Sequence, residues 1–228
     1  RPRVGGPPDL RPDVSVGDRL PFPDVVLGFD DYDAPAARLA AQLNVRYAKV
    51  AVHRFPDGES RVTVPSPLPA RVAMCRSLDH PNDKLVETIL AAEAARQNGA
   101  RSITLIAPYL CYMRQDIAFN PGEAVSQRIV GGWLADRFDA VVTVDPHLHR
   151  VTTLAEAVPA ADAVALSAAA LFGAYLQERE PDALLVGPDE ESAQWLAAAT
   201  RDHPFETAVC RKLREEARND TPLLMLTA

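Results

Sequence analysis

Apolar residues along this chain occur in short runs and in longer stretches with a different spacing. Short runs rich in valine, isoleucine and leucine are typical of buried strands, whereas apolar residues repeated every three or four positions are typical of helices. The runs predict strands at residues 25–29, 50–55, 61–64, 71–75, 103–107, 140–144, 183–187 and 206–210. The longer stretches predict helices at residues 33–43, 82–98, 124–137, 167–179 and 190–200.

Strands and helices alternate through the second half of the chain. This order favours right-handed βαβ units, because two parallel strands need a crossover that a helix supplies. The sequence therefore predicts an α/β fold with mostly parallel sheets flanked by helices. Residues 1–23 are rich in proline and glycine, and we expect them to form an N-terminal arm outside the core.

Composition limits the kinds of partner and the cellular location that we expect for this protein. Of the 228 residues, 47% are hydrophobic, which is enough for a sizeable core. The formal net charge of -7 gives no electrostatic reason to expect a nucleic acid or a membrane as partner. Cys75, Cys111 and Cys210 lie far apart without the spacing of metal ligands, which favours a reducing compartment. Since neither a signal peptide nor a long apolar run is visible, we expect a cytoplasmic protein.

The segment from Ile103 to Ser126 concentrates the candidate chemistry. Its apolar beginning predicts a buried strand, which Pro108 ends because proline brings no N–H group to a sheet. Ligands of open α/β sheets bind beyond the carboxyl ends of strands. The residues that follow this strand include Tyr109, Tyr112, Arg114, Gln115 and Asp116. They suit a ligand with a flat ring and anionic groups, and an ordinary solvated loop is the alternative.

Two further strand ends carry acidic or imidazole groups. The FPDGE turn, Phe55 to Glu59, places two carboxylates beside an aromatic ring, which suits a purine or a metal contact; an ordinary Pro-Asp-Gly turn is the alternative. In DPHLH, Asp145, His147 and His149 are candidate ligands or supporting residues for a divalent cation. A capped turn without metal is the alternative there.

A third strand end, GPDEES, places Asp189 between a strand and a helix. The first turn of a helix attracts anions, so this position suits a phosphate, and a plain N-cap is the alternative. The chain has no GxxxxGK[ST] motif, so a nucleotide site of the P-loop kind is excluded.

In this order and spacing, FPDGE, APYLCYMRQD with GEAVS, TVDPHLH, VGPDEES and RKLR resemble the motifs of the ribose-phosphate pyrophosphokinases, also called phosphoribosyl pyrophosphate synthetases. The resemblance runs from about Val25 to Arg214, and PYxxYxRQD is its most specific part. It implies two phosphoribosyltransferase-like lobes of type I fold, at residues 24–155 and 156–228, and a homo-oligomer of dimers within hexamers. The implied activity is transfer of the diphosphoryl group of Mg-ATP to the C1 hydroxyl of ribose 5-phosphate.

The resemblance also assigns roles to residues. It places contacts with ATP at Phe55, Asp57, Glu59, Arg114, Gln115 and Asp116, with the first three reaching the adenine across a subunit interface. It assigns magnesium (Mg²⁺) binding to His147 and Asp189, and Asp189 also helps to hold the ribose ring. Lys212 and Arg214 match a catalytic pair on a mobile loop over the reacting phosphates, although KLREEAR also suits a solvated helix face.

Two departures from the family pattern leave other functions open. The run after Asp189 is Glu190-Glu191-Ser192 where the family has glycines, and extra carboxylates repel a phosphate ester. The family's Asp-Asp-x-x-x-Thr-Gly phosphate loop is also missing, because TPLLM begins a strand and the sequence stops at Ala228. We therefore expect the second lobe to be incomplete. A non-catalytic homologue with a regulatory or binding role, or a phosphoribosyltransferase, is the alternative to the synthetase.

Overall fold

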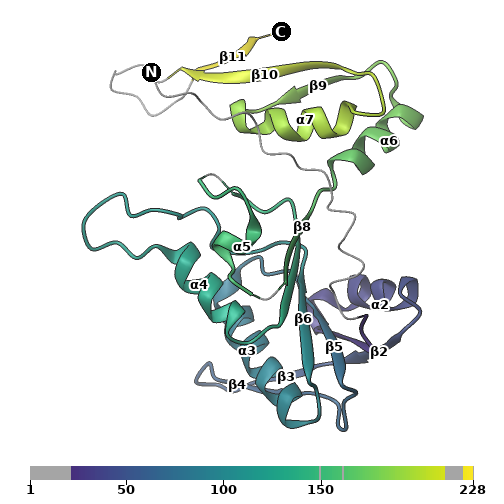
Figure 1. Ribbon diagram of the computed structural model, residues 1–228, viewed down its shortest axis with the longest axis vertical. Helices are drawn as coiled ribbons and strands as arrows, with labels where there is room; N and C mark the ends of the chain where they lie inside the picture. The colour runs from purple at the N-terminus through teal and green to yellow at the C-terminus, as the bar shows by residue number, and fades with distance from the viewer. Residues whose placement is uncertain (1–21, 149, 161, 214–222, 228) are drawn as a thin grey trace. The chain divides into compact units, whose positions relative to one another are not determined.

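The structure is a computed structural model that describes residues 22–148, 150–160, 162–213 and 223–227. The chain forms two compact units, of which the first ends at Leu166 and the second begins at Ser167. Each unit is an α/β unit with strands and helices in alternation, as Figure 1 shows. The predicted α/β class, with a mostly parallel sheet flanked by helices, is confirmed.

A six-stranded sheet forms the centre of the first unit. Its strand order is β2-β1-β5-β6-β7-β8, and every neighbouring pair is parallel. The strands are β1 (Val25–Gly28), β2 (Arg46–Lys49), β5 (Arg71–Cys75), β6 (Ser102–Ala107), β7 (Ala140–Val144) and β8 (Asp162–Leu166). All carboxyl ends therefore lie along one edge of the sheet.

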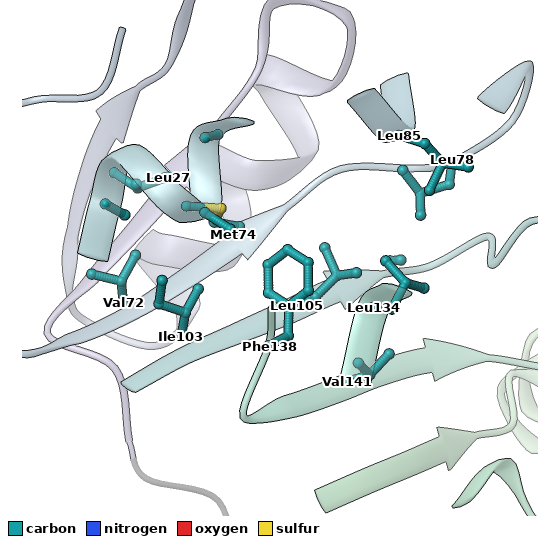
Figure 2. Close-up of a cluster of buried hydrophobic side chains, with 14 of the residues drawn as sticks. Leu27, Val72, Met74, Leu78, Leu85, Ile103, Leu105, Leu134, Phe138 and Val141 are labelled. Atoms are coloured by element: carbon teal, nitrogen blue, oxygen red, sulfur yellow. The ribbon is translucent and has the colours of Figure 1, made fainter. Parts of the chain in front are cut away.

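Helices cover both faces of this sheet, because neighbouring residues of a strand point to opposite faces. Helix α2 (Asp33–Gln42) packs against Val26, Ala73 and Cys75 on one face. On the other face, β1, β5, β6 and β7 contribute to one large apolar cluster with α3 (Pro81–Gln97) and α4 (Ser126–Ala135). Figure 1 shows α2 on one side of the sheet and α3 with α4 on the other, and Figure 2 shows the larger cluster.

A separate two-stranded antiparallel hairpin also belongs to the first unit. It consists of β3 (Ala51–Arg54) and β4 (Ser60–Thr63), joined by the turn from Phe55 to Glu59. Val52 and Val62 pair across the hairpin and pack against the large apolar cluster, which fixes one face of the hairpin to the body of the unit.

The second unit has a three-stranded sheet in the order β11-β10-β9. Strands β9 (Leu184–Gly187) and β10 (Glu206–Leu213) are parallel, and β11 (Leu223–Thr227) is antiparallel to β10. Helices α6 (Ala169–Arg179) and α7 (Ala193–Thr200) contribute Ala169, Ala198 and Ala199 to a small core. A short 3₁₀ turn, Glu190–Ser192, precedes α7, so the predicted helix at 190–200 is divided into two parts.

Sequence reasoning found the central strands and missed two edge strands. β2 and β8 flank the sheet, and their residues are exposed or half-buried. β2 lacks the apolar run that signals a buried strand, whereas the short run Ala163–Leu166 of β8 lies in an alanine-rich stretch that gives no clear strand pattern. Because β8 pairs with β7, the sheet extends beyond residue 155, where the first lobe was expected to end. The expected N-terminal arm, except for its last two residues, lies outside the described residues. Among the helices that the structure describes, none is long and apolar enough to cross a membrane.

Candidate functional site

A cavity of about 330 Å³ lies at the carboxyl ends of β6 and β7. Residues 109–110 and 112–115, which follow β6, form one wall, and residues 144–147, at the end of β7, form the other. The two strands are parallel neighbours, so the segments that leave them start at the same edge of the sheet. The crevice predicted beyond Ala107 is therefore present, and it is shared with the segment that carries His147.

One backbone hydrogen bond joins the segments that form the two walls, and a second joins the wall after β7 to β8. The carbonyl oxygen of Pro108 accepts a hydrogen bond from the amide of Val144 at 3.2 Å. Asp145 adopts a left-handed backbone conformation, with φ of 42°, and its amide donates to the carbonyl oxygen of Leu166 at 2.8 Å. Such a conformation is uncommon for a residue with a side chain, and here it turns the chain sharply between β7 and His147.

The cavity combines a cation, an amide, an imidazole and aromatic rings. Arg114 is exposed, and its planar guanidinium group is suited to bind phosphate oxygens in pairs. The side chain of Gln115 is held in place, because its Oε1 atom accepts a hydrogen bond from Oγ of Ser126 at 2.7 Å. Tyr109 is 51% exposed beside them and offers a ring face to a planar ligand. These groups suit a ligand with a flat ring and a phosphate chain.

Asp116 does not line this cavity. Its side chain is buried, and Oδ1 accepts a hydrogen bond from the guanidinium of Arg150 at 2.6 Å. The other oxygen, Oδ2, is buried without a hydrogen-bond partner among the residues that the structure describes. Asp116 therefore ties the segment after β6 to the segment after β7, and a direct contact with ATP stays a prediction.

The end of β7 offers two candidate ligands for a divalent cation. Asp145 and His147 both line the cavity, and they offer a carboxylate and an imidazole. No three His, Cys, Asp or Glu residues group closely enough to hold a metal ion by themselves in the described ranges, from which His149 is missing. Magnesium prefers oxygen ligands and is commonly held by one or two carboxylates together with waters and substrate phosphates, so the carboxylate of Asp145 suits magnesium, and a direct role of His147 stays a prediction.

The FPDGE turn lies apart from the cavity within one chain. The amide of Phe55 donates to the carbonyl oxygen of Glu59 at 2.8 Å, and the amide of Glu59 donates to Oδ1 of Asp57 at 3.1 Å. Gly58 has φ of 93°, a conformation that favours glycine. The aromatic ring and both carboxylates are exposed. The turn lines a different hollow, of about 290 Å³, against α3.

Asp189 lies in the second unit, where it caps the 3₁₀ turn before α7. Its Oδ1 atom accepts a hydrogen bond from the amide of Ser192 at 3.1 Å. A side chain at Gly187 would collide with Ser192, since a Cβ atom there would lie 2.1 Å from its Oγ. The alternative of an N-cap is thus present, and a role in holding magnesium or ribose stays a prediction.

Lys212 lies in strand β10, opposite Leu224 of β11, where the resemblance placed a loop. The strand predicted at 206–210 continues to Leu213, which accounts for the difference. Arg214 lies outside the described residues. The catalytic role of this pair stays a prediction.

Sequence reasoning missed a buried ion-pair cluster at the ends of β1 and β5. In the sheet, β2 follows on one side of β1 and β5 on the other side, so the strand order reverses between β1 and β5. Ligand crevices of α/β sheets commonly open at such a switch point. Here Arg76 occupies the position, 4% exposed, with its guanidinium 4.2 Å from the centre of the Phe29 ring. It pairs with Asp31 at 3.1 Å and with Glu87 at 2.7 Å. The only signal in the sequence is an arginine directly after the buried strand RVAMC.

Comparison with known proteins gives the family. Residues 25–136 match the N-terminal domain of ribose phosphate pyrophosphokinase. The ribose-phosphate pyrophosphokinase of Methanopyrus kandleri is 44% identical over 157 residues, which are 67% of this chain and 52% of that protein. The chain belongs to the ribose-phosphate pyrophosphokinase family. The corresponding protein of Halobacterium salinarum is 36% identical over 167 residues, 73% of this chain and 58% of that protein.

The fold agrees with membership of the pyrophosphokinase family. A crystal structure of phosphoribosylpyrophosphate synthetase from Mycobacterium smegmatis superimposes with a TM-score of 0.71 at 22% identity, covering 84% of this chain and 65% of that one. The chain spans about half the length of the curated relatives that it matches, between 52% and 58% for the two named above. The family resemblance in the sequence is confirmed.

Proposed function

We propose that this protein is a ribose-phosphate diphosphokinase, a transferase that makes phosphoribosyl pyrophosphate from Mg-ATP and ribose 5-phosphate and releases AMP. One observation carries the proposal. In a chain of this family, three residues predicted from sequence to bind ATP or magnesium, Arg114, Gln115 and His147, line a single cavity at the carboxyl ends of β6 and β7. A cation, a fixed amide and an imidazole around one cavity suit a magnesium nucleotide.

Binding and alignment are the work of this site, because phosphoryl-type transfer needs charge neutralisation more than covalent help. Arg114 binds phosphate oxygens, and Gln115, held by Ser126, orients the nucleotide. Asp145 and His147 would hold magnesium, which neutralises phosphate charge when bound. Asp189 is assigned to magnesium and the ribose ring. Catalysis is assigned to Lys212 and Arg214 as cations over the reacting phosphates.

The FPDGE turn supports a homo-oligomer. Phe55, Asp57 and Glu59 are assigned to the adenine of ATP, yet within one chain they do not line the cavity that holds Arg114. A second copy would bring an exposed turn to a neighbour's nucleotide, which agrees with the assembly of dimers to hexamers expected from the resemblance. A cytoplasmic location is favoured by the three free, buried cysteines.

The decisive assay measures AMP release from ATP with and without ribose 5-phosphate in the presence of magnesium. We expect AMP to appear only with both substrates and phosphoribosyl pyrophosphate to form in equal amount. Binding of ATP without AMP release at saturating magnesium would instead indicate a non-catalytic homologue. In that case Glu190, Glu191 and Ser192, which stand where the family has glycines, would explain the loss of activity.

Arg114→Ala tests the nucleotide site directly. We expect the KM for ATP to rise by about tenfold or more, since hydrogen bonds to charged groups contribute about 1.5–3 kcal/mol. The melting temperature should stay unchanged, because Arg114 is exposed. Arg128→Ala is the matched control, an exposed arginine on α4 that does not line the cavity. Equal KM values for the two variants would remove Arg114 from the site.

A further inference from the structure

The hairpin β3–β4 carries the FPDGE turn, and it is held by apolar packing and by polar contacts with α3. It forms a two-stranded sheet of its own and makes no ladder with the central sheet. A two-stranded hairpin is marginally stable by itself in water. Val52 and Val62 fix one face of it by apolar packing, which is not directional. Packing of this kind does not determine where the tip of the hairpin points.

A single carboxylate oxygen binds both ends of the turn. Arg54 directly precedes the turn and Ser60 directly follows it, and the two residues pair as the last rung of the hairpin. The Nε atom of Arg54 donates to Oε1 of Glu87 at 3.2 Å. The hydroxyl of Ser60 donates to the same Oε1 at 3.0 Å. Glu87 therefore closes the base of the turn from outside the hairpin.

The body of the first unit holds Glu87 itself. Glu87 lies in α3 and is 1% exposed, so its ionised form needs strong compensation. Arg76, which is 4% exposed, supplies it with a contact of 2.7 Å to the second oxygen, Oε2. Arg76 is fixed in turn by Asp31 and by the Phe29 ring. Sheet, helix and turn are thus connected through one buried side chain.

We propose that Glu87 is a positioning residue for the nucleotide, because it fixes the Phe55–Glu59 turn in the conformation that binds the adenine. The inference rests on the proposed function for its second half, the role of the turn. Stability alone does not explain a buried ion pair, since apolar residues of similar volume are commonly as stable. Two fixed donors at the base of an exposed turn instead restrict the direction of its aromatic ring and its carboxylates.

The test removes the donors on the hairpin and leaves Glu87 and Arg76 intact. The variant Arg54→Ala/Ser60→Ala loses both contacts to Oε1 and also the exposed ion pair between Arg54 and Asp83 at 3.1 Å, so Asp83→Ala is measured beside it to separate the two losses. Replacement of Glu87 itself would leave the buried Arg76 without one of its partners and would mix a change in positioning with a change in folding. Arg71→Ala is the matched control, a half-exposed strand arginine that pairs with Asp24. Ser60→Thr keeps the hydroxyl and should behave as the parent protein.

Hydrogen exchange of the full chain gives a readout that does not depend on activity. We expect amide exchange in residues 51–63 to become several-fold faster in the double variant, with β7 unchanged. We expect the KM for ATP to rise by about tenfold, while kcat and the KM for ribose 5-phosphate stay within twofold. If the contacts with Glu87 only stabilised the fold, the double variant would have a lower melting temperature but the same KM for ATP and the same kcat as the parent protein.

Three outcomes would overturn the proposal. Unchanged exchange in residues 51–63 would show that Glu87 does not hold the turn. Faster exchange with an unchanged KM for ATP, in a protein that releases AMP, would show that the held turn does not serve the nucleotide. A Ser60→Thr variant as impaired as the double variant would show that the hydroxyl is not the group that matters. If the parent protein neither binds ATP nor releases AMP, the proposed function fails, and the exchange readout alone decides whether Glu87 holds the turn.

Discussion

At the scale of single residues, the stability of the first unit depends on the buried charge of Arg76. Its guanidinium reaches Asp31, Glu87 and the ring of Phe29, and it is almost excluded from water. Removing one partner of a buried pair leaves the other charged and without compensation. Replacing Arg76 or one of its partners should therefore lower the free energy of unfolding more than replacing a member of an exposed ion pair.

We predict that Arg76→Ala lowers the free energy of unfolding by about 3–5 kcal/mol, because the buried carboxylate of Glu87 then keeps only Arg54, whose side chain is largely exposed, as a cationic partner. Arg71→Ala, which breaks the exposed pair with Asp24, should have a much smaller effect, because water screens an exposed pair. Urea unfolding of both variants measures the difference. Similar losses in the two variants would contradict the assignment of Arg76 as a buried partner.

Buried thiols give a dependence on pH. Burial raises the pKa of Cys75 to about 11 and that of Cys111 to about 12, from an ordinary value of 9.0. The unfolded thiols ionise first, so their stabilising contribution is complete below pH 9 and is lost as the pH rises from about 9 through the folded pKa values. The free energy of unfolding should fall by about 1.4 kcal/mol per pH unit for each thiol in that window.

Cys111→Ala isolates one thiol. The space left by the missing sulfur lowers the free energy of unfolding at every pH. The fall of this free energy with pH, between about pH 9.5 and 11, should be less steep than in the parent protein. Urea unfolding across this range gives both slopes. Identical slopes would show that Cys111 ionises equally well in the folded and the unfolded chain.

His147 provides the test of the metal assignment. We predict that His147→Ala raises the magnesium concentration for half-maximal activity by about tenfold, because a lost ligand is replaced by water. The magnesium titration is compared with that of Arg114→Ala, which should change the KM for ATP more than the magnesium requirement. An unaltered titration in His147→Ala would remove His147 from the metal site.

At the scale of elements, glycine determines how closely helix α4 approaches its neighbour. A Cβ atom at Gly131 would lie 1.8 Å from the backbone oxygen of Ala157 in α5 (Leu154–Ala157). At Gly132, the next residue of the same helix, no atom lies within 4 Å of such a Cβ. The two glycines therefore differ only in what surrounds them.

We predict opposite effects for these two positions. Gly131→Ala should destabilise the protein by about 1–3 kcal/mol, since a backbone atom has to move. Gly132→Ala should stabilise it by about 0.5–1 kcal/mol, because alanine favours a helix more than glycine does. Thermal unfolding of the pair measures the sign directly. A gain in stability for Gly131→Ala would contradict the close contact between α4 and α5.

Elements were predictable from sequence where burial was complete. Strands β5, β6 and β7 have near-continuous apolar runs, and helix α3 ends before Gly99 as expected. β2 was not predictable because an edge strand needs less apolar surface, and β8 was not because its short apolar run lies within an alanine-rich stretch. The cavity was predictable in part, since Arg114, Gln115 and His147 follow buried strands in sequence. The contacts of Glu87 were not, because a glutamate in a helix gives no sign that it is buried against an arginine after another strand.

At the scale of the whole molecule, the two units differ in the size of their cores. The first has a large cluster on one face of a six-stranded sheet and a smaller one on the other face, and the second has a small cluster around Ala169, Ala198 and Ala199. We predict that residues 167–213 unfold at a lower urea concentration than residues 22–166, because less apolar area is buried. Hydrogen exchange at increasing urea separates the two. A single transition for all amides would contradict independent stability of the units.

The cation at the switch point also suggests a form of chemical complementation. Arg76→Ala would leave a space bounded by two carboxylates and the ring of Phe29, which matches a free guanidinium ion in size and charge. Guanidinium at millimolar concentration, far below the denaturing range, would then bind the folded variant and raise its melting temperature. The parent protein, whose arginine fills this space, would not respond, so the same additive would stabilise one sequence and leave the other unchanged.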